Sequence, residues 1–225
     1  RYTIPMDRET EEPLYNIDVF YQCDVDEVSA CDAIIPLKVA SYDLEMYSKS
    51  GLFPQAKKGD PIVQIGVSYR WSDKLMDPLR RVVFVVGSVD PSDDDTEFIA
   101  CNSEEDMLFR FAHEIRKQNP DVMCGYNTFG FDDAYIEDRC EELDILDLID
   151  LSRVQSKTKK GDSWCVKFSE TKKFELASGK YDLRFLTLRG RLGLDLLLNM
   201  RREHSLDSFK LDSVASTFLR DKVLQ

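Results

Sequence analysis

Three carboxylates have the residue types and spacing needed to hold a divalent cation. Asp43 and Glu45 lie two apart in a segment that alternates apolar and polar residues, so a strand there would place both side chains on one face. Apolar neighbours predict a central strand, where unpaired carboxylates are costly and a cation would relieve their charge. Two acids on a strand edge in water produce the same pattern, so this pair alone does not decide the question.

The third carboxylate is Asp132, at the start of a predicted helix that follows a short predicted strand. A carboxylate there can take part in chemistry. It can also simply stabilise the helix, by roughly 0.3–1 kcal/mol, because the first turn carries a partial positive charge. The residue types leave both interpretations open, and the surrounding sequence has to decide between them.

Composition and charge limit the possible classes of protein. The chain has 225 residues, 43% hydrophobic and 11% aromatic, which is enough to bury a core and excludes a disordered chain. The formal net charge is −12, yet residues 153–180 hold eight basic and three acidic side chains. A polyanion could bind this basic segment, although a solvated loop explains the same run of charge. No apolar run is long enough to span a membrane, so no membrane partner is expected.

Local periodicity predicts the elements that must position the acids. Strands are predicted over residues 37–47, 62–71, 81–87 and 121–124, and helices over 103–118 and from about 132 to 143. Hairpins are predicted over 153–190, then a strand leading into a helix over 192–200 and a last helix over 208–219. This order predicts an α/β fold, a mixed sheet flanked by helices, with a β-hairpin insertion.

Several segments, in order, resemble the exonuclease region of family B DNA polymerases. SYDLE at residues 41–45 resembles the first exonuclease motif, usually F-D-I-E, and NPDVMCGYNTFGFD at 119–132 resembles the second, Y-N-x-x-x-F-D with its lead-in. GRLGLDLL around Asp195, SFKLDSVA at 208–215 and GLFP at 51–54 resemble further family segments. The resemblance covers about residues 35–219 and is greatest to delta-type and large-DNA-virus enzymes.

The resemblance implies a ribonuclease-H-like 3′–5′ proofreading exonuclease within a replicative DNA-directed DNA polymerase, an enzyme that removes mispaired 3′ nucleotides. Its catalytic and metal-binding residues would be Asp43, Glu45 and Asp132. Two Mg²⁺ (or Mn²⁺) ions would be the cofactors, since these cations take hard oxygen ligands and suit phosphoryl chemistry. The single-stranded 3′ end of DNA would contact Tyr126, Asn127 and Phe131.

The basic run then gains a second interpretation. In the family the corresponding hairpin region lies near DNA, so Lys157, Lys159 and Lys160 are expected to contact it. The resemblance also implies that the full-length enzyme binds primer–template DNA, dNTPs and other replication proteins. It would act in the nucleus, or in a viral replication compartment if the source is viral.

One expected part has no match in this chain. The family's third motif, Y-x-x-x-D, is matched in spacing only by Tyr69 and Asp73, which precede the second motif and are therefore rejected. We expect the third motif and the polymerase domain beyond Gln225. Residues 1–33 would be the end of an N-terminal domain or a lead-in, and residues 34–225 an incomplete exonuclease domain with little activity alone. The alternative is a catalytically degenerate, nuclease-like scaffold or DNA-binding module.

Overall fold

The computed structural model describes residues 30, 32–74, 77–90, 94–154, 158–160, 163–165, 169–176 and 179–219. The predicted lead-in over residues 1–33 lies almost wholly outside this range. Among the described residues, no helix has both the length and the apolar character needed to cross a bilayer.

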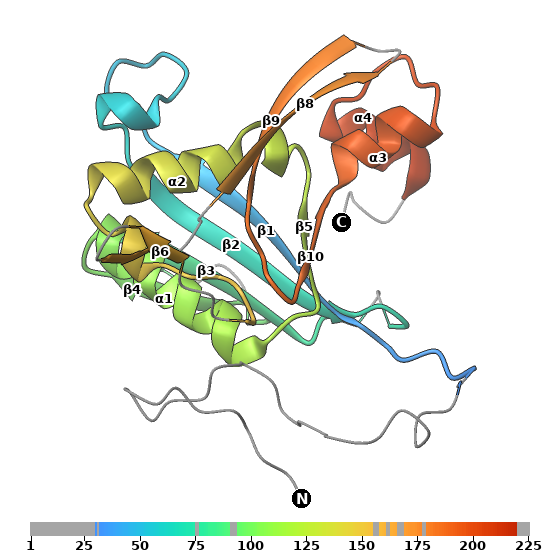
Figure 1. Ribbon diagram of the computed structural model, residues 1–225, viewed down its shortest axis with the longest axis horizontal. Helices are drawn as coiled ribbons and strands as arrows, with labels where there is room; N and C mark the ends of the chain where they lie inside the picture. Colours follow the sequence, from blue (N-terminus) through green and yellow to red (C-terminus); the bar gives the residue numbers. More distant parts are fainter. Residues whose placement is uncertain are drawn as a thin grey trace, which may run out of the picture.

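The centre of the fold is a mixed six-stranded sheet (Figure 1). Its strands lie in the order β10-β5-β1-β2-β3-β4. In chain order they are β1 (Lys38–Met46), β2 (Ile62–Trp71), β3 (Arg80–Val86), β4 (Glu97–Cys101), β5 (Val122–Gly125) and β10 (Leu192–Asp195). β2 runs antiparallel to β1 and β3, whereas β4, β5 and β10 each run parallel to the neighbour they join. The predicted central position of the Asp43–Glu45 strand is confirmed, because β1 lies between β2 and β5.

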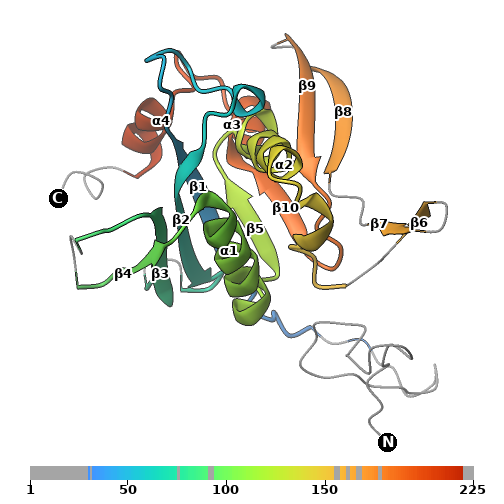
Figure 2. The same ribbon diagram turned by 90° about the vertical axis from the view of Figure 1, so that its left-hand side faces the viewer.

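Two helices cover one face of this sheet, as Figure 2 shows from the side. They are α1 (Glu104–Gln118) and α2 (Asp132–Glu142). The start of α1 follows the predicted cap, since the Ser103 hydroxyl accepts from the Asp106 N–H at 3.1 Å. Apolar side chains of both helices, including Phe111 and Ile136, share one buried cluster with Tyr42 and Leu44 of β1. The opposite face of β1 is left to its polar residues.

The remaining elements are hairpins and short helices. The hairpins are β6 (Thr158–Lys160) with β7 (Ser163–Cys165), and β8 (Ser169–Leu176) with β9 (Gly179–Leu186). The short helices are η2 (Ala56–Lys58), η3 (Thr128–Gly130), η4 (Leu146–Leu148), α3 (Leu196–Glu203) and α4 (Leu211–Phe218). The architecture is the ribonuclease-H-like α/β fold that the resemblance implied, hairpin insertion included. Strand β4 was not predicted, because its five residues follow an acidic turn and lack an alternating pattern.

Candidate active site

Strand β1 separates its acids from the core by simple alternation. Tyr42 and Leu44 are each only 4% exposed, whereas Asp43 and Glu45 are exposed on the other face. β1 pairs with β2 along its whole length, but its pairing with β5 runs only from Val39 to Ser41. The acid-bearing end of β1 therefore extends past β5, and this end is where the chain after β5 can approach it.

Asp132, the first residue of α2, approaches β1 at this point. Its side chain is buried, with 5% exposed. Burial raises its pKa to about 7, and the negative charge of Asp43 is the next cause, while the backbone of Leu44 and of Asp132 itself lowers it by hydrogen bonding. Asp43 and Asp132, 89 positions apart in sequence, are therefore close enough to repel each other in the fold.

Glu45 is placed on the same face as Asp43, one pleat further along β1. The structure does not draw it into a compact site with the other two acids. Within the described part of the chain, no group of three or more His, Cys, Asp or Glu side chains is arranged to hold a metal ion. Folding thus brings together two of the three predicted ligands, Asp43 and Asp132, and leaves Glu45 on the same face of β1 as Asp43.

The pair of acids fits a divalent cation on chemical grounds. A buried carboxylate near another carboxylate is destabilised when charged, and a hard cation bound between them relieves that repulsion. Among the described residues, neither Asp43 nor Asp132 has an ion-pair partner of its own. Asp43, Glu45 and Asp132 are oxygen donors of the kind that Mg²⁺ and Mn²⁺ prefer.

The three predicted DNA-binding residues of the second motif lie in different settings. Asn127 is exposed and holds a left-handed backbone conformation, with φ of 67°. Phe131 is half-buried, and its ring centroid lies 5.2 Å from that of Phe53, whose side chain is 71% exposed. Tyr126 has a structural contact instead, because its hydroxyl donates to the Phe209 carbonyl oxygen at 2.6 Å. Asn127 and Phe131 are thus open to a ligand, whereas Tyr126 joins the motif to the segment before α4.

Asp195 holds the loop that carries this motif, a role that sequence reasoning did not assign. It is 3% exposed and accepts hydrogen bonds from three backbone N–H groups. The N–H groups of Asn127 and Leu197 each lie 2.9 Å from Oδ1, and that of Phe129 lies 3.1 Å from Oδ2. The same carboxylate therefore caps α3 and fixes the turn leading to Asp132. The only signal in the sequence was its place in the segment GRLGLDLL.

Asp133 is a second carboxylate that sequence reasoning missed. It is 1% exposed, and burial raises its pKa to about 7 against the opposing effect of two hydrogen bonds. Its Oδ1 accepts from the Tyr42 hydroxyl and its Oδ2 from the Leu186 N–H at 3.0 Å. Two consecutive aspartates at a helix start were visible in the sequence, but nothing there distinguished the second as a buried link between elements.

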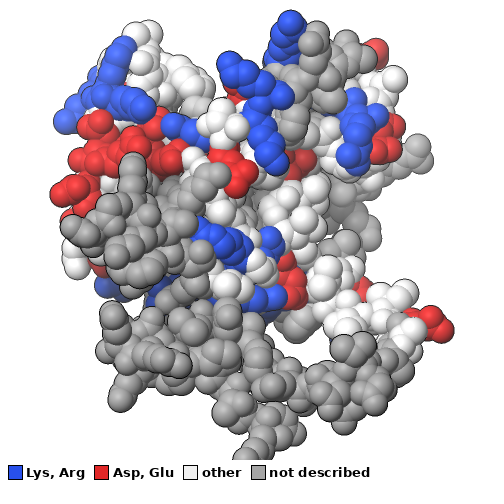
Figure 3. Space-filling model, viewed as in Figure 1, with Lys and Arg blue, Asp and Glu red and all other residues white. Residues whose placement is uncertain are grey.

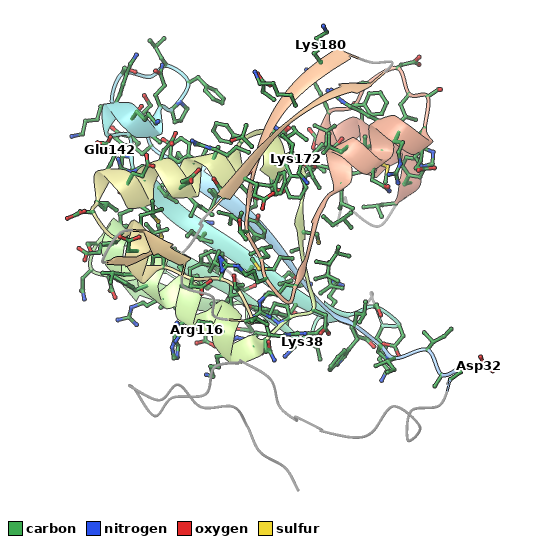
Figure 4. The ribbon with its side chains drawn as sticks, in the orientation of Figure 1. Asp32, Lys38, Arg116, Glu142, Lys172 and Lys180 are labelled. Atoms are coloured by element: carbon green, nitrogen blue, oxygen red, sulfur yellow. The ribbon has the colours of Figure 1, made fainter. Side chains whose placement is uncertain are left out.

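The predicted basic contacts fall largely outside the described part of the molecule. Lys157 lies outside it, and Lys159 and Lys160 are described only as backbone of β6. The neighbouring β8–β9 hairpin does carry basic side chains, among them Lys172 and Lys180 (Figure 4). Figure 3 shows Lys and Arg side chains over this hairpin and acidic side chains over α2.

The hairpin is joined to α2 by ion pairs at its base. Arg184 of β9 lies 2.7 Å from Asp138 and 3.2 Å from Glu137 of α2. The Ser169 hydroxyl at the start of β8 also bonds to Glu137, at 2.6 Å. These contacts hold the base of the hairpin beside the helix that begins with Asp132.

Comparison with known proteins agrees with this geometry. Residues 1–214 match the family described as DNA polymerase family B, exonuclease domain. Over 187 residues the chain is 33% identical to the DNA polymerase delta catalytic subunit of Candida albicans, covering 83% of this chain and 17% of that protein. It is 33% identical over 169 residues to a DNA polymerase of Pyramimonas orientalis virus, covering 74% of this chain and 13% of that one. Against the DNA polymerase delta catalytic subunit of Caenorhabditis elegans the identity is 30% over 192 residues, with 84% and 17% covered.

The chain spans less than a fifth of the length of these three relatives. The matched family covers nearly all of this sequence, in the order of motifs found along it. The fold of this chain buries Asp132 close enough to Asp43 for the charge of Asp43 to raise the pKa of Asp132. This chain therefore belongs to the exonuclease domain of the family B DNA polymerases.

Proposed function

We propose that this chain is the 3′–5′ proofreading exonuclease region of a replicative DNA-directed DNA polymerase. The observation that carries the proposal is the burial of Asp132 beside Asp43, two acids without a cationic partner among the described residues. Asp43, Glu45 and Asp132 would hold one or two Mg²⁺ (or Mn²⁺) ions. Such ions, when bound, activate an attacking water and stabilise a leaving 3′ oxygen. The family's third motif, beyond Gln225, would supply the remaining carboxylate.

Residues of this chain would bind the single-stranded 3′ end of the DNA substrate. Phe131 and Phe53 form an open aromatic pair close in sequence to the site acids, and aromatic faces bind single-stranded bases with little sequence preference. Asn127 and Tyr126 would contact the same frayed 3′ end, with Asp195 holding Asn127 in place through its backbone N–H. A proofreading site needs this tolerance, because any of the four bases can be the mispaired one.

The alternative, a degenerate scaffold, is not favoured. A site without catalytic use has no physical reason to keep a buried carboxylate facing a second one, an arrangement that costs stability in the absence of a cation. In the full-length protein we further propose that primer–template DNA, dNTPs and other replication proteins are the partners. The nucleus, or a viral replication compartment, would be the location.

The test uses the full-length polymerase that contains this chain and a primer with a mispaired 3′ end. Asp43→Ala and Asp132→Ala should each abolish Mg²⁺-dependent removal of the 3′ nucleotide and leave polymerisation nearly intact. Asp147→Ala, which removes an exposed acid of η4, is the matched control and should behave as wild type. An equal loss of exonuclease and polymerase activity in the site variants would contradict the assignment.

The basic segment has its own test. Replacing Lys157, Lys159 and Lys160 by Glu in the full-length enzyme should weaken DNA binding and flatten its dependence on salt, because fewer counterions are then released on binding. Fluorescence anisotropy with a primer–template over a range of salt concentrations measures both effects. An unchanged salt slope would identify the segment as a solvated loop.

A further inference from the structure

One buried carboxylate joins three elements next to the site without being one of its predicted ligands. Asp133 of α2 is 1% exposed. Its Oδ1 accepts from the hydroxyl of Tyr42 on β1, and its Oδ2 accepts from the N–H of Leu186 at the end of β9, at 3.0 Å. The strand that carries Asp43, the helix that begins with Asp132 and the base of the β8–β9 hairpin therefore meet at this side chain.

The two residues joined by this hydrogen bond, Tyr42 and Asp133, are sequence neighbours of two of the predicted metal ligands. Tyr42 directly precedes Asp43, and Asp133 directly follows Asp132. Successive residues of a strand point to opposite faces, so Tyr42 is directed into the interior while Asp43 is directed to the site. On the interior side of β1, the hydrogen bond between Tyr42 and Asp133 thus connects the two backbone segments that carry Asp43 and Asp132.

The start of α2 has no side-chain cap. Its N-cap residue is Phe131, which has no side-chain acceptor, and no side-chain cap is formed there. A helix end without a cap depends on tertiary contacts for its position. Asp133 supplies two such contacts, both to segments distant in sequence.

We propose that Tyr42 and Asp133 are positioning residues that set Asp132 against Asp43 and so determine how well the site binds its divalent cation. The proposal rests on the proposed exonuclease function. Neither residue touches the substrate; each acts through the acid beside it. Removing a group that orients a metal ligand through a hydrogen bond typically lowers metal affinity or activity by about 10- to 100-fold.

The substitutions follow from hydrogen-bond chemistry. Tyr42→Phe removes the donor and leaves a buried oxygen of Asp133 without its partner. Asp133→Ala removes both links. Asp133→Asn keeps both, because its carbonyl oxygen can accept from Leu186 and its amide can donate to the Tyr42 oxygen. Tyr69→Phe is the matched control, since Tyr69 is a buried tyrosine of β2 whose hydroxyl has no hydrogen-bond partner in the described structure.

The experiment uses the full-length polymerase with two readouts. Mn²⁺ binding is measured from the free-ion signal in electron paramagnetic resonance, and exonuclease rate is measured against Mg²⁺ concentration at a temperature where every variant is folded. Tyr42→Phe and Asp133→Ala should weaken Mn²⁺ binding at the exonuclease site roughly 10-fold or more and raise the Mg²⁺ needed for half-maximal rate to match. The KM for DNA and the polymerisation rate should not change. Asp133→Asn and Tyr69→Phe should resemble wild type.

The outcomes separate the two hypotheses. If wild type shows metal-dependent exonuclease activity and Tyr42→Phe and Asp133→Ala lose only melting temperature, with unchanged Mn²⁺ binding and Mg²⁺ dependence, the pair merely stabilises the fold and the positioning role is refuted. If wild type itself shows no such activity, the proposed function fails and the positioning role fails with it. A selective loss of metal affinity that Asp133→Asn does not share supports both.

Discussion

Asp132 should make the metal-free protein less stable as the pH rises, and Asp132→Asn should remove that effect. Burial, followed by the charge of Asp43, raises the pKa of Asp132 from 3.8 to about 7. Between these values the folded protein keeps a proton that the unfolded chain has lost. The free energy of unfolding therefore falls as the pH rises through this window and levels off above pH 7.

The magnitude follows from the width of the window. Each pH unit within it is worth about 1.4 kcal/mol per group, so Asp132 alone should lower the free energy of unfolding by about 2.5 kcal/mol between pH 5 and pH 8. Asp133, whose pKa burial also raises to about 7, contributes in the same direction. Asp132→Asn should therefore remove only its own share of the loss, leaving that of Asp133.

The assay is urea unfolding of the chain in EDTA at pH 5 and pH 8. Glu45→Gln is the control, because it removes one negative charge from an exposed position on the same face as Asp43. Saturating Mg²⁺ at pH 8 should stabilise wild type more than Asp132→Asn, since a cation that binds only the folded site shifts the equilibrium toward it. If Asp132→Asn loses as much stability as wild type between the two pH values, the inferred burial and repulsion at Asp132 are wrong.

Three further predictions concern the scaffold around the site. Arg139→Met should lower the free energy of unfolding, measured in urea, by about 3–5 kcal/mol, because it leaves the buried Glu104 without its charge partner. Arg139 bonds to Glu104 at 2.7 and 2.8 Å. A decrease below about 1 kcal/mol would refute this prediction. Gly125→Ala should lower the free energy of unfolding by about 1–3 kcal/mol, since an added Cβ would lie 2.3 Å from Thr128 Cγ2. An unchanged melting temperature would contradict this prediction. Asp195→Ala should lower the free energy of unfolding by about 1–3 kcal/mol and speed hydrogen exchange of the backbone N–H groups of Asn127, Phe129 and Leu197, which donate to Asp195. Unaltered exchange would argue against the role of Asp195 in holding the loop.

Elements with a strong local pattern were predictable from the sequence. β1 and α1 follow from alternation and from a helical apolar stripe with a capping serine, and their observed bounds differ from the predicted ones by a residue. β4 was missed because a five-residue strand is specified mainly by its parallel pairing with β3, which is not a local property. The same applies to the hydrogen bond from the Tyr126 hydroxyl to Phe209, 83 residues further along the chain, which no local pattern predicts.

The sequence by itself determined which acids are available and that Asp43 and Glu45 share a face, because a strand alternates with period two and a motif keeps its order. Only the tertiary structure decided what surrounds each acid. Tertiary packing buried Asp132 near Asp43. It also directed three backbone N–H groups to the Asp195 carboxylate, and the Tyr42 hydroxyl and Leu186 N–H to the Asp133 carboxylate. The physical reason is that the energy of a carboxylate depends on its burial and on the partners within hydrogen-bond distance. Both are set by the packing of segments that lie far apart in the chain.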